Sequence, residues 1–307
     1  MKRHCKLCCL LLACLLLAAC AAPSKSDGTA KPYTFTDAAG NTVSVSSCAR
    51  VAVLFSSLAD IWVSAGGAVT VTVGETVERG IVANGVTLVD SGAGKTVNTE
   101  ALIAAAPDLV ILSADIPAQV AAADLCYAAG IPAALLRVES FAEYLTVLKI
   151  FTDLTGQPQR YTALGTAQKE RIDALVTAQP FAGKRILFIR AGSSARSVKA
   201  KDSTDNFAAA MITELGAANV ADEAPLLLDG LSMEAVLAAD PDYIFFTAMG
   251  DEAASKAFVT DMLTEDTWQG LRAVRAGRWG YLPKELFHYK PCARWAEAYA
   301  YLAAFNM

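Results

Sequence analysis

A twelve-residue segment that occurs twice constrains the fold of this chain more than any other feature. Glu100–Ile111 (EALIAAAPDLVI) aligns without gaps on Glu234–Phe245 (EAVLAADPDYIF), with an offset of 134 residues and six of the twelve positions identical. Each copy begins with a helical pattern, ends the helix at Pro-Asp and continues into a short apolar strand. A period this long indicates two structural halves of similar plan, and it is too long for a solenoid repeat.

Short apolar runs elsewhere predict the strands of both halves. Strands are expected at 50–54, 69–73 and 109–112 in the first half and at 185–189 and 243–246 in the second. The runs show no alternation of polar and apolar residues, which is typical of parallel sheets covered by helices on both faces. With 307 residues the chain is long enough for two domains. The sequence therefore predicts an α/β fold with two parallel-sheet lobes.

One long helix is expected to join the two lobes. Residues 140–154 (SFAEYLTVLKIFTDL) carry an apolar stripe at helical spacing, with Ser140 as the N-cap and Gly156 as the stop. A second helix is expected over about 159–178. We therefore predict a first lobe over 33–139, an inter-lobe helix over 140–156 and a second lobe over 157–307. A single helical link is stiff, so the lobes should close over a ligand by only a small angle.

The N-terminal segment has the pattern of an export signal. Three cationic residues within Met1–Lys6 precede an apolar run, Leu7–Ala22, that is shorter than the roughly 20 residues a spanning helix needs. We predict a signal peptide over 1–19 and a flexible tether over 20–32. Leu17-Ala18-Ala19-Cys20 resembles the lipobox of bacterial lipoproteins, in which the cysteine is lipidated, so Cys20 is the expected lipid anchor. An ordinary signal peptide that contains cysteines is the alternative.

Composition and motifs argue against several function classes. The formal net charge is −5 and no basic cluster stands out, so nucleic acid is not an expected partner. No metal site is expected from the one histidine of the mature chain and its three scattered cysteines, Cys48, Cys126 and Cys292, whose pairing stays open. Gly94-Lys95-Thr96 lacks the first glycine of a P-loop and no G-x-S-x-G occurs, so an enzyme is not expected.

These features together resemble the substrate-binding lipoproteins of ABC importers for iron complexes and cobalamin. The resemblance covers about residues 45–302, and the two repeated segments look like the family's most recognisable motifs. It extends to 198–207, to 214–216 with Asn219, and to 287–291 before 293–295, where it resembles members from Gram-positive bacteria. The fold implied is that of class III periplasmic binding proteins. The function implied is capture of an iron complex (haem or siderophore) by a lipoprotein on the outer face of the cytoplasmic membrane, and its delivery to a permease dimer with its ATPase.

The resemblance also implies roles for individual residues. Glu100 and Glu234 match the surface glutamates that bind arginines of the permease in that family. The alternative interpretation is that each glutamate, in the first turn of its helix, stabilises that helix through the helix dipole. Two open alternatives keep the fold: a cobalamin-binding member of the family, or a sensor or docking module that works without a transporter. A surface hydrolase has the least support.

The ligand is expected between the lobes, at the carboxyl ends of the strands. This rule selects the segments 55–57, 74–79, 113–115, 190–196, 247–249 and 283–291. Iron chelates, haem and corrins are large and partly anionic, so aromatic and cationic side chains are the candidates: Trp62, Arg190, Arg196, Lys199, Lys201, His288, Tyr289 and Lys290. His288 or Tyr289 could be an axial ligand of haem, although a capping or solvent-facing role for His288 is the simpler interpretation. No resident cofactor is expected.

Overall fold

The computed structural model describes residues 31–90, 96–224 and 226–306. The chain divides into two units, Met1–Pro32 and Tyr33–Met307, and the fold below is that of the second unit. The predicted signal peptide, Cys20 and nearly all of the tether lie outside the described residues.

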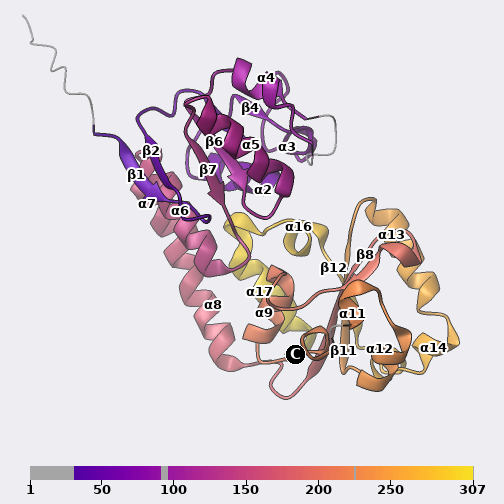
Figure 1. The fold of residues 1–307 in the computed structure, drawn as a ribbon. Coiled ribbons are helices and arrows are strands. Elements are labelled where there is room, and N and C mark those ends of the chain that lie inside the picture. The colour runs from indigo at the N-terminus through magenta and orange to yellow at the C-terminus, as the bar shows by residue number, and fades with distance from the viewer. Residues whose placement is uncertain (1–30, 91–95, 225, 307) are drawn as a thin grey trace, which may run out of the picture. The chain divides into compact units, whose positions relative to one another are not determined.

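The first lobe contains a five-stranded parallel sheet (Figure 1). Its strand order is β5-β4-β3-β6-β7, and all four neighbouring pairs are parallel. The strands are β3 (Val51–Val53), β4 (Val71–Thr72), β5 (Thr87–Leu88), β6 (Leu109–Ser113) and β7 (Ala133–Leu136). The helices are α2 (Ser56–Ser64), α3 (Gly74–Glu78), α4 (Thr99–Ala104) and α5 (Pro117–Ala128). An antiparallel hairpin, β1 (Tyr33–Thr36) and β2 (Thr42–Val45), precedes them.

The second lobe repeats this plan with its own sheet. Parallel strands lie in the order β10-β8-β11-β12, and β9 adds to β8 in the antiparallel direction, which the sequence did not predict. The strands are β8 (Arg185–Ala191), β9 (Val198–Ala200), β10 (Ala218–Asn219), β11 (Tyr243–Ala248) and β12 (Trp279–Leu282). The helices are α9 (Phe207–Glu214), α10 (Val220–Glu223), α11 (Leu226–Asp229), α12 (Met233–Ala239), α13 (Glu252–Met262), α14 (Asp266–Gln269), α15 (Arg272–Arg275), α16 (Lys284–Phe287) and α17 (Trp295–Ala303). Short helical turns are η2 (Ala195–Ser197), η3 (Cys292–Arg294) and η4 (Ala304–Asn306). The fold class is thus confirmed.

The internal repeat extends to the backbone conformation. Asn98 caps α4 and Ser232 caps α12, each by accepting a hydrogen bond from the third residue after it. Each helix ends just before the Pro-Asp pair, where Ala106 (φ 48°) and Asp240 (φ 37°) adopt the same left-handed conformation. The chain then enters β6, which lies next to β3, or β11, which lies next to β8. The repeated sequence therefore encodes one helix–turn–strand unit in each lobe.

Two helical stretches connect the sheets. From β7 the chain enters α6 (Phe141–Leu154), turns at Gly156 (φ 66°), and returns through α7 (Pro158–Tyr161), the π-helical turn η1 (Thr162–Thr166) and α8 (Ala167–Ala178) to β8. Ser140 caps α6 as predicted, because its hydroxyl accepts from the N–H of Glu143. Within η1, a Cβ on Gly165 would lie 2.8 Å from Cδ2 of Leu145, so a larger residue here would require the Leu145 side chain to move.

Both lobes contribute to one continuous hydrophobic core. Alternate residues of β3 and β6, such as Val53 and Ile111, share a cluster with Ile186 and Phe188 of β8, together with α6 and α17. The opposite face of each sheet has a separate cluster with its own helices. Because interiors pack at near-crystalline density, a shared core resists large rotation of one lobe against the other.

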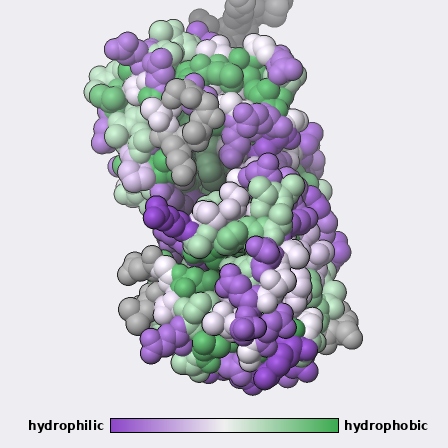
Figure 2. Space-filling model, turned by 90° about the vertical axis from the view of Figure 1, so that its right-hand side faces the viewer, coloured by the Kyte–Doolittle hydropathy of each residue, from purple (hydrophilic) through white to green (hydrophobic). Residues whose placement is uncertain are grey.

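None of the helices in the described ranges is both long and apolar enough to cross a membrane. On the face shown in Figure 2, hydrophobic residues form small groups among hydrophilic ones. Cys48, Cys126 and Cys292 are free thiols, the last two of them buried.

Candidate ligand-binding site

A cavity of about 350 Å³ lies where the carboxyl ends of the two sheets meet. The first lobe lines it with residues that follow β3, β4, β6 and β7: Leu54, Phe55, Ser56, Ser57, Val73, Glu75, Ile116 and Glu139. The second lobe contributes residues at or after the ends of β8, β11 and β12: Arg190, Met249, His288, Tyr289 and Lys290. The volume is within the range of small-molecule sites, and the lining mixes apolar walls with a few polar groups.

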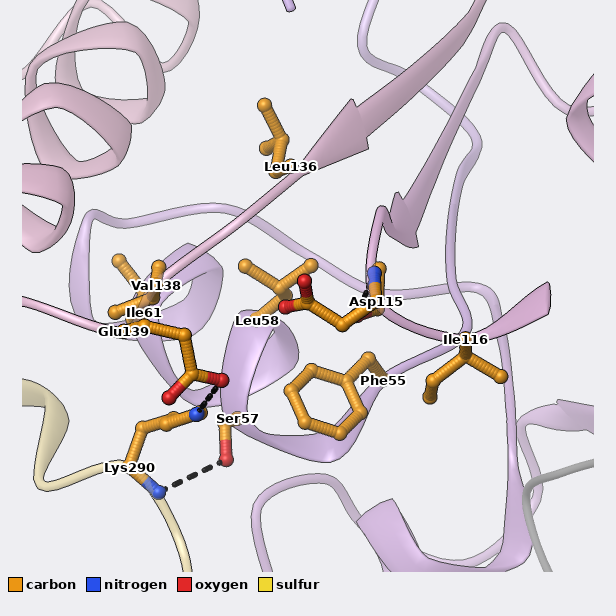
Figure 3. Close-up of a pocket in the computed structure, with 11 residues that line it drawn as sticks. Phe55, Ser57, Leu58, Ile61, Asp115, Ile116, Leu136, Val138, Glu139 and Lys290 are labelled. Carbon is orange, nitrogen blue, oxygen red and sulfur yellow. Dashed lines mark hydrogen bonds and ion pairs between the residues drawn. The ribbon is translucent and has the colours of Figure 1, made fainter. Parts of the chain in front are cut away.

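A narrower pocket of about 70 Å³ opens beside it and shares five lining residues: Phe55, Ser57, Ile116, Glu139 and Lys290. Figure 3 shows the carboxylates of Asp115 and Glu139 pointing into this pocket, with the ring of Phe55 on one side. Leu58, Ile61, Leu136 and Val138 supply the rest of its apolar wall. This side pocket has room for only a few ligand atoms.

Arg190 and His288 form a polar pair within the second lobe's share of the cavity. Nη2 of Arg190 lies 2.9 Å from Nδ1 of His288, and Nε of Arg190 is buried with no hydrogen-bond partner among the described residues. Burial lowers the pKa of Arg190. Burial, followed by the charge of Arg190, lowers the pKa of His288 to about 3, so its imidazole is neutral at physiological pH. The cation of Arg190 is thus bonded to a neutral group, which leaves its charge available to an anion.

Lys290 and Glu139 join the two lobes at the edge of the cavity. Nζ of Lys290 donates to Oε1 of Glu139, and their side chains are only 12% and 16% exposed. Oε2 of Glu139 also accepts from the backbone N–H of Phe207, at 3.2 Å. Burial lowers the pKa of Lys290 and raises that of Glu139, in each case against the effect of the partner's charge. The pair is therefore substantially desolvated.

Arg79 makes a second contact between the lobes. Its guanidinium carbon lies 4.0 Å from the ring centroid of Tyr289, and Nη1 donates to Oγ of Ser56 at 2.9 Å. The hydroxyl of Ser56 in turn donates to Glu75. Nζ of Lys284 also lies 5.2 Å from the Tyr289 ring centroid. Two cations thus interact with the Tyr289 ring and favour its orientation.

Four of the eight candidate ligand-binding residues line the cavity. These are Arg190, His288, Tyr289 and Lys290. Arg196 and Lys199 are exposed on η2 and β9, and Lys201 is half-buried just after β9; none of the three lines the cavity.

Trp62 lies in the core, away from the cavity. Its side chain is 1% exposed, contacts Phe151 edge to face at 5.2 Å between centroids, and donates from Nε1 to the carbonyl oxygen of Ala68 at 2.9 Å. A Cβ on Gly67 would lie 2.1 Å from the indole, so the chain is built closely around this ring. Trp62 is therefore not available to a ligand in this structure.

Three charged residues at the site are not among the candidates from the sequence: Glu75 and Glu139, which line the cavity, and Arg79, which contacts the cavity residues Ser56 and Tyr289. Glu75 and Arg79 lie within the selected segment 74–79, but nothing in the sequence marked them within it. Glu139 is the last residue of the predicted first lobe and directly precedes Ser140, the predicted N-cap. Its position after β7 is the signal that could have identified it, because that strand ends at the same edge of the sheet.

Glu100 and Glu234 are both exposed, each in the first turn of its short helix. Glu100 belongs to the first lobe and Glu234 to the second. Neither takes part in an ion pair with another residue in the described part of the chain. Both carboxylates are thus accessible to another protein.

Residues 51–286 match a family model described as periplasmic binding protein. The chain belongs to the periplasmic binding protein family. Members of this family are extracytoplasmic solute-binding proteins rather than enzymes. The matched residues include both parallel sheets and all of the cavity lining except His288, Tyr289 and Lys290. No curated protein sequence matches the chain.

Solved structures agree with this family fold. An ABC transporter substrate-binding protein from Listeria monocytogenes EGD-e is 17% identical, with a TM-score of 0.67 over 83% of this chain and 97% of that one. The periplasmic heme-binding protein RhuT from Roseiflexus sp. RS-1 is 20% identical, with a TM-score of 0.67 over 84% and 97%. The siderophore-binding protein BauB, solved with acinetobactin and ferric iron, is 13% identical, with a TM-score of 0.71 over 90% and 98%. At these identities the likeness establishes the fold.

Proposed function

We propose that this periplasmic binding protein captures an anionic iron complex, haem or a siderophore chelate, in the cavity between its lobes and delivers it to an ABC importer. The observation that carries the proposal is Arg190, a cation at the carboxyl end of β8 whose partner is the neutral imidazole of His288. Charged groups in cavities are normally paired. Glu139 acts on the charge of Arg190, but within the described part of the chain Arg190 forms no ion pair, and an anionic ligand would supply one.

Several further features support an anionic ligand. Arg79, Lys284 and Lys290 also surround His288 closely enough to lower its pKa. Phe55, Leu54, Val73 and Ile116 offer apolar surface to the organic part of a chelate. The structural neighbours include proteins whose names state heme or siderophore binding, such as RhuT and BauB. Affinity would come from desolvation of the ligand between walls that are largely preformed.

Delivery would use the two exposed carboxylates. Glu100 and Glu234 occupy equivalent positions of the internal repeat, one on each lobe. Two arginines of a permease dimer could bind them together, and simultaneous engagement strengthens binding by effective concentration. Lipidation of Cys20 would hold the protein at the outer face of the membrane, within reach of that permease.

The absorption spectrum of the purified protein tests the nature of the cargo. A Soret band would identify haem, and charge-transfer absorption of a ferric chelate would identify a siderophore. A corrin spectrum would identify cobalamin and contradict the proposal. If the protein is colourless, titration with ferric siderophores and haemin follows, and the absence of saturable binding to all of them would also contradict it.

A further inference from the structure

The pairing of Arg190 with His288 determines where the imidazole carries its proton. Nη2 of Arg190 lies 2.9 Å from Nδ1 of His288. A guanidinium group can only donate hydrogen bonds, so Nδ1 must accept, and the single proton of the neutral ring then resides on Nε2. The backbone keeps the ring in place, because His288 follows α16 directly and its N–H donates to the carbonyl oxygen of Lys284 at 3.0 Å.

The surroundings of His288 keep its imidazole ring neutral. Burial and four cations, of which Arg190 acts most strongly, lower the pKa of the imidazole to about 3. The remaining ring nitrogen, Nε2, has no hydrogen-bond partner in the described part of the chain, and His288 lines the cavity. Nε2–H is therefore a free donor next to a cation.

This assignment bears directly on how a metal complex could bind. A ring nitrogen that carries a proton has no lone pair for a metal. To coordinate iron through Nε2, the proton would have to move to Nδ1, where it would face the Arg190 donor at 2.9 Å. Nδ1 and Nε2 point away from opposite ends of the ring, so Arg190 and the Nε2–H donor would face different oxygens of a ligand that carries several anionic oxygens.

We propose that Arg190 fixes His288 as an Nε2–H donor, and that the two side chains bind different anionic oxygens of one ligand, such as carboxylate, catecholate or hydroxamate oxygens, while His288 does not coordinate the metal. This inference rests on the proposed function for the presence of an iron complex in the cavity. The tautomer of His288, however, is a property of the ligand-free protein. Arg190 acts here as a positioning residue for His288.

The tautomer can be observed by long-range ¹H–¹⁵N NMR on protein labelled at histidine. The chain has only two histidines, His4 and His288, and His288→Gln assigns the signal by removing it. We expect an unprotonated Nδ1 and a protonated Nε2 that do not change between pH 8 and pH 5. In Arg190→Met the Nδ1–H form should become detectable and titration should move toward the ordinary value of about 6.5. Arg190→Lys, which keeps a charged donor, should behave like the wild type.

Two results of this experiment would overturn the proposal. One is an Nδ1–H imidazole in the wild-type protein. The other is a spectrum and pH profile of Arg190→Met that match the wild type in a folded protein, as judged by circular dichroism.

Binding measurements test the role of the Nε2–H donor separately. With ferric citrate and haemin as probes, His288→Gln, which retains an amide donor, should lose roughly threefold in affinity. His288→Met, which retains only a metal-ligating sulfur, should lose tenfold or more. Equal losses, or tighter binding by His288→Met, would overturn the donor role. If the wild type binds neither probe nor any ferric siderophore, the proposed function fails, while the NMR result still decides the tautomer.

Discussion

Lys290 and Glu139 form an ion pair that crosses from one lobe to the other at the edge of the ligand cavity. Glu139 follows the last strand of the first sheet, and Lys290 follows the last strand of the second. Glu139 also accepts from the N–H of Phe207, at the start of α9. The pair therefore couples the stability of the fold to the geometry of the site.

Removal of either charge from this pair should destabilise the protein substantially. Glu139→Gln leaves the desolvated ammonium of Lys290 without a counter-charge, so we expect the free energy of unfolding to fall by about 2–4 kcal/mol. Urea denaturation measures the change. The double variant with Lys290→Met should lose less than the sum of the single variants.

The matched control for this pair is a solvent-exposed one. Lys169 and Asp173 form an ion pair on α8 with side chains 54% and 58% exposed. Asp173→Asn should therefore change the stability by less than about 0.5 kcal/mol. Similar losses at Asp173 and Glu139 would contradict the view that the inter-lobe pair is desolvated.

Stability should fall in mild acid because of His288. Burial and Arg190 hold the pKa of its imidazole at about 3 in the folded protein, whereas the unfolded chain titrates near 6.5. Between these values only the unfolded chain binds the proton, so stability decreases as the pH falls from 6.5 toward 3, by at most about 1.4 kcal/mol per pH unit. Urea titrations at pH 7.5 and pH 5.0 should show a loss up to about 2 kcal/mol larger for the wild type than for His288→Gln. Equal losses would show that His288 titrates alike in both states.

Arg190 should contribute more to affinity than other arginines of the chain. Arg190→Ala removes the charge at the end of β8, and we expect the affinity for the preferred iron complex to fall by about tenfold to a hundredfold. Arg171→Ala, at an exposed position of α8, should leave the affinity within about twofold. Fluorescence titration measures both. Similar affinities of Arg190→Ala and Arg171→Ala would contradict a role for Arg190 in ligand binding.

Charge reversal at the two exposed glutamates should impair delivery without affecting capture. Glu100→Arg or Glu234→Arg should slow uptake in cells by at least about tenfold, because each would face the permease with the wrong charge. Glu170→Arg, on an exposed part of α8, serves as the control. Ligand affinity of the purified variants should match the wild type. Unimpaired uptake in Glu100→Arg/Glu234→Arg would favour a sensor or docking module instead.

The sequence predicted the central strands β3, β4, β6, β8 and β11 because both faces of each sheet are buried. Residues 51–53 and 109–112 contribute alternately to two different cores, so each of these positions is apolar and the strands are easy to recognise. The predicted strands also indicated where the cavity lies, because the residues that follow parallel strands all lie at the carboxyl edge of the sheet. The other strands of the two sheets, β5, β7, β9, β10 and β12, and the β1–β2 hairpin were not predicted, because two to four residues carry too little pattern.

Individual site residues were harder to predict than segments. Trp62 follows a cavity segment, but the helical turn between Ser57 and Trp62 rotates the indole into the core, and only packing determines that face. Lys199 and Lys201 lie on or beside a strand whose position was unknown. Arg79 and Glu139 have roles that depend on contacts across the two lobes. No local pattern encodes such contacts.

Equilibrium titration of the wild-type protein tests the central claim most directly. The ligands are a ferric catecholate siderophore, a ferric hydroxamate siderophore, haemin and cobalamin, followed by calorimetry or by quenching of tryptophan fluorescence. We expect one iron complex to bind with one-to-one stoichiometry and a Kd of about 1 μM or lower, equivalent to about −8 kcal/mol, and cobalamin to bind at least about tenfold more weakly. Saturable binding of cobalamin alone, or of none of the four, would contradict the account.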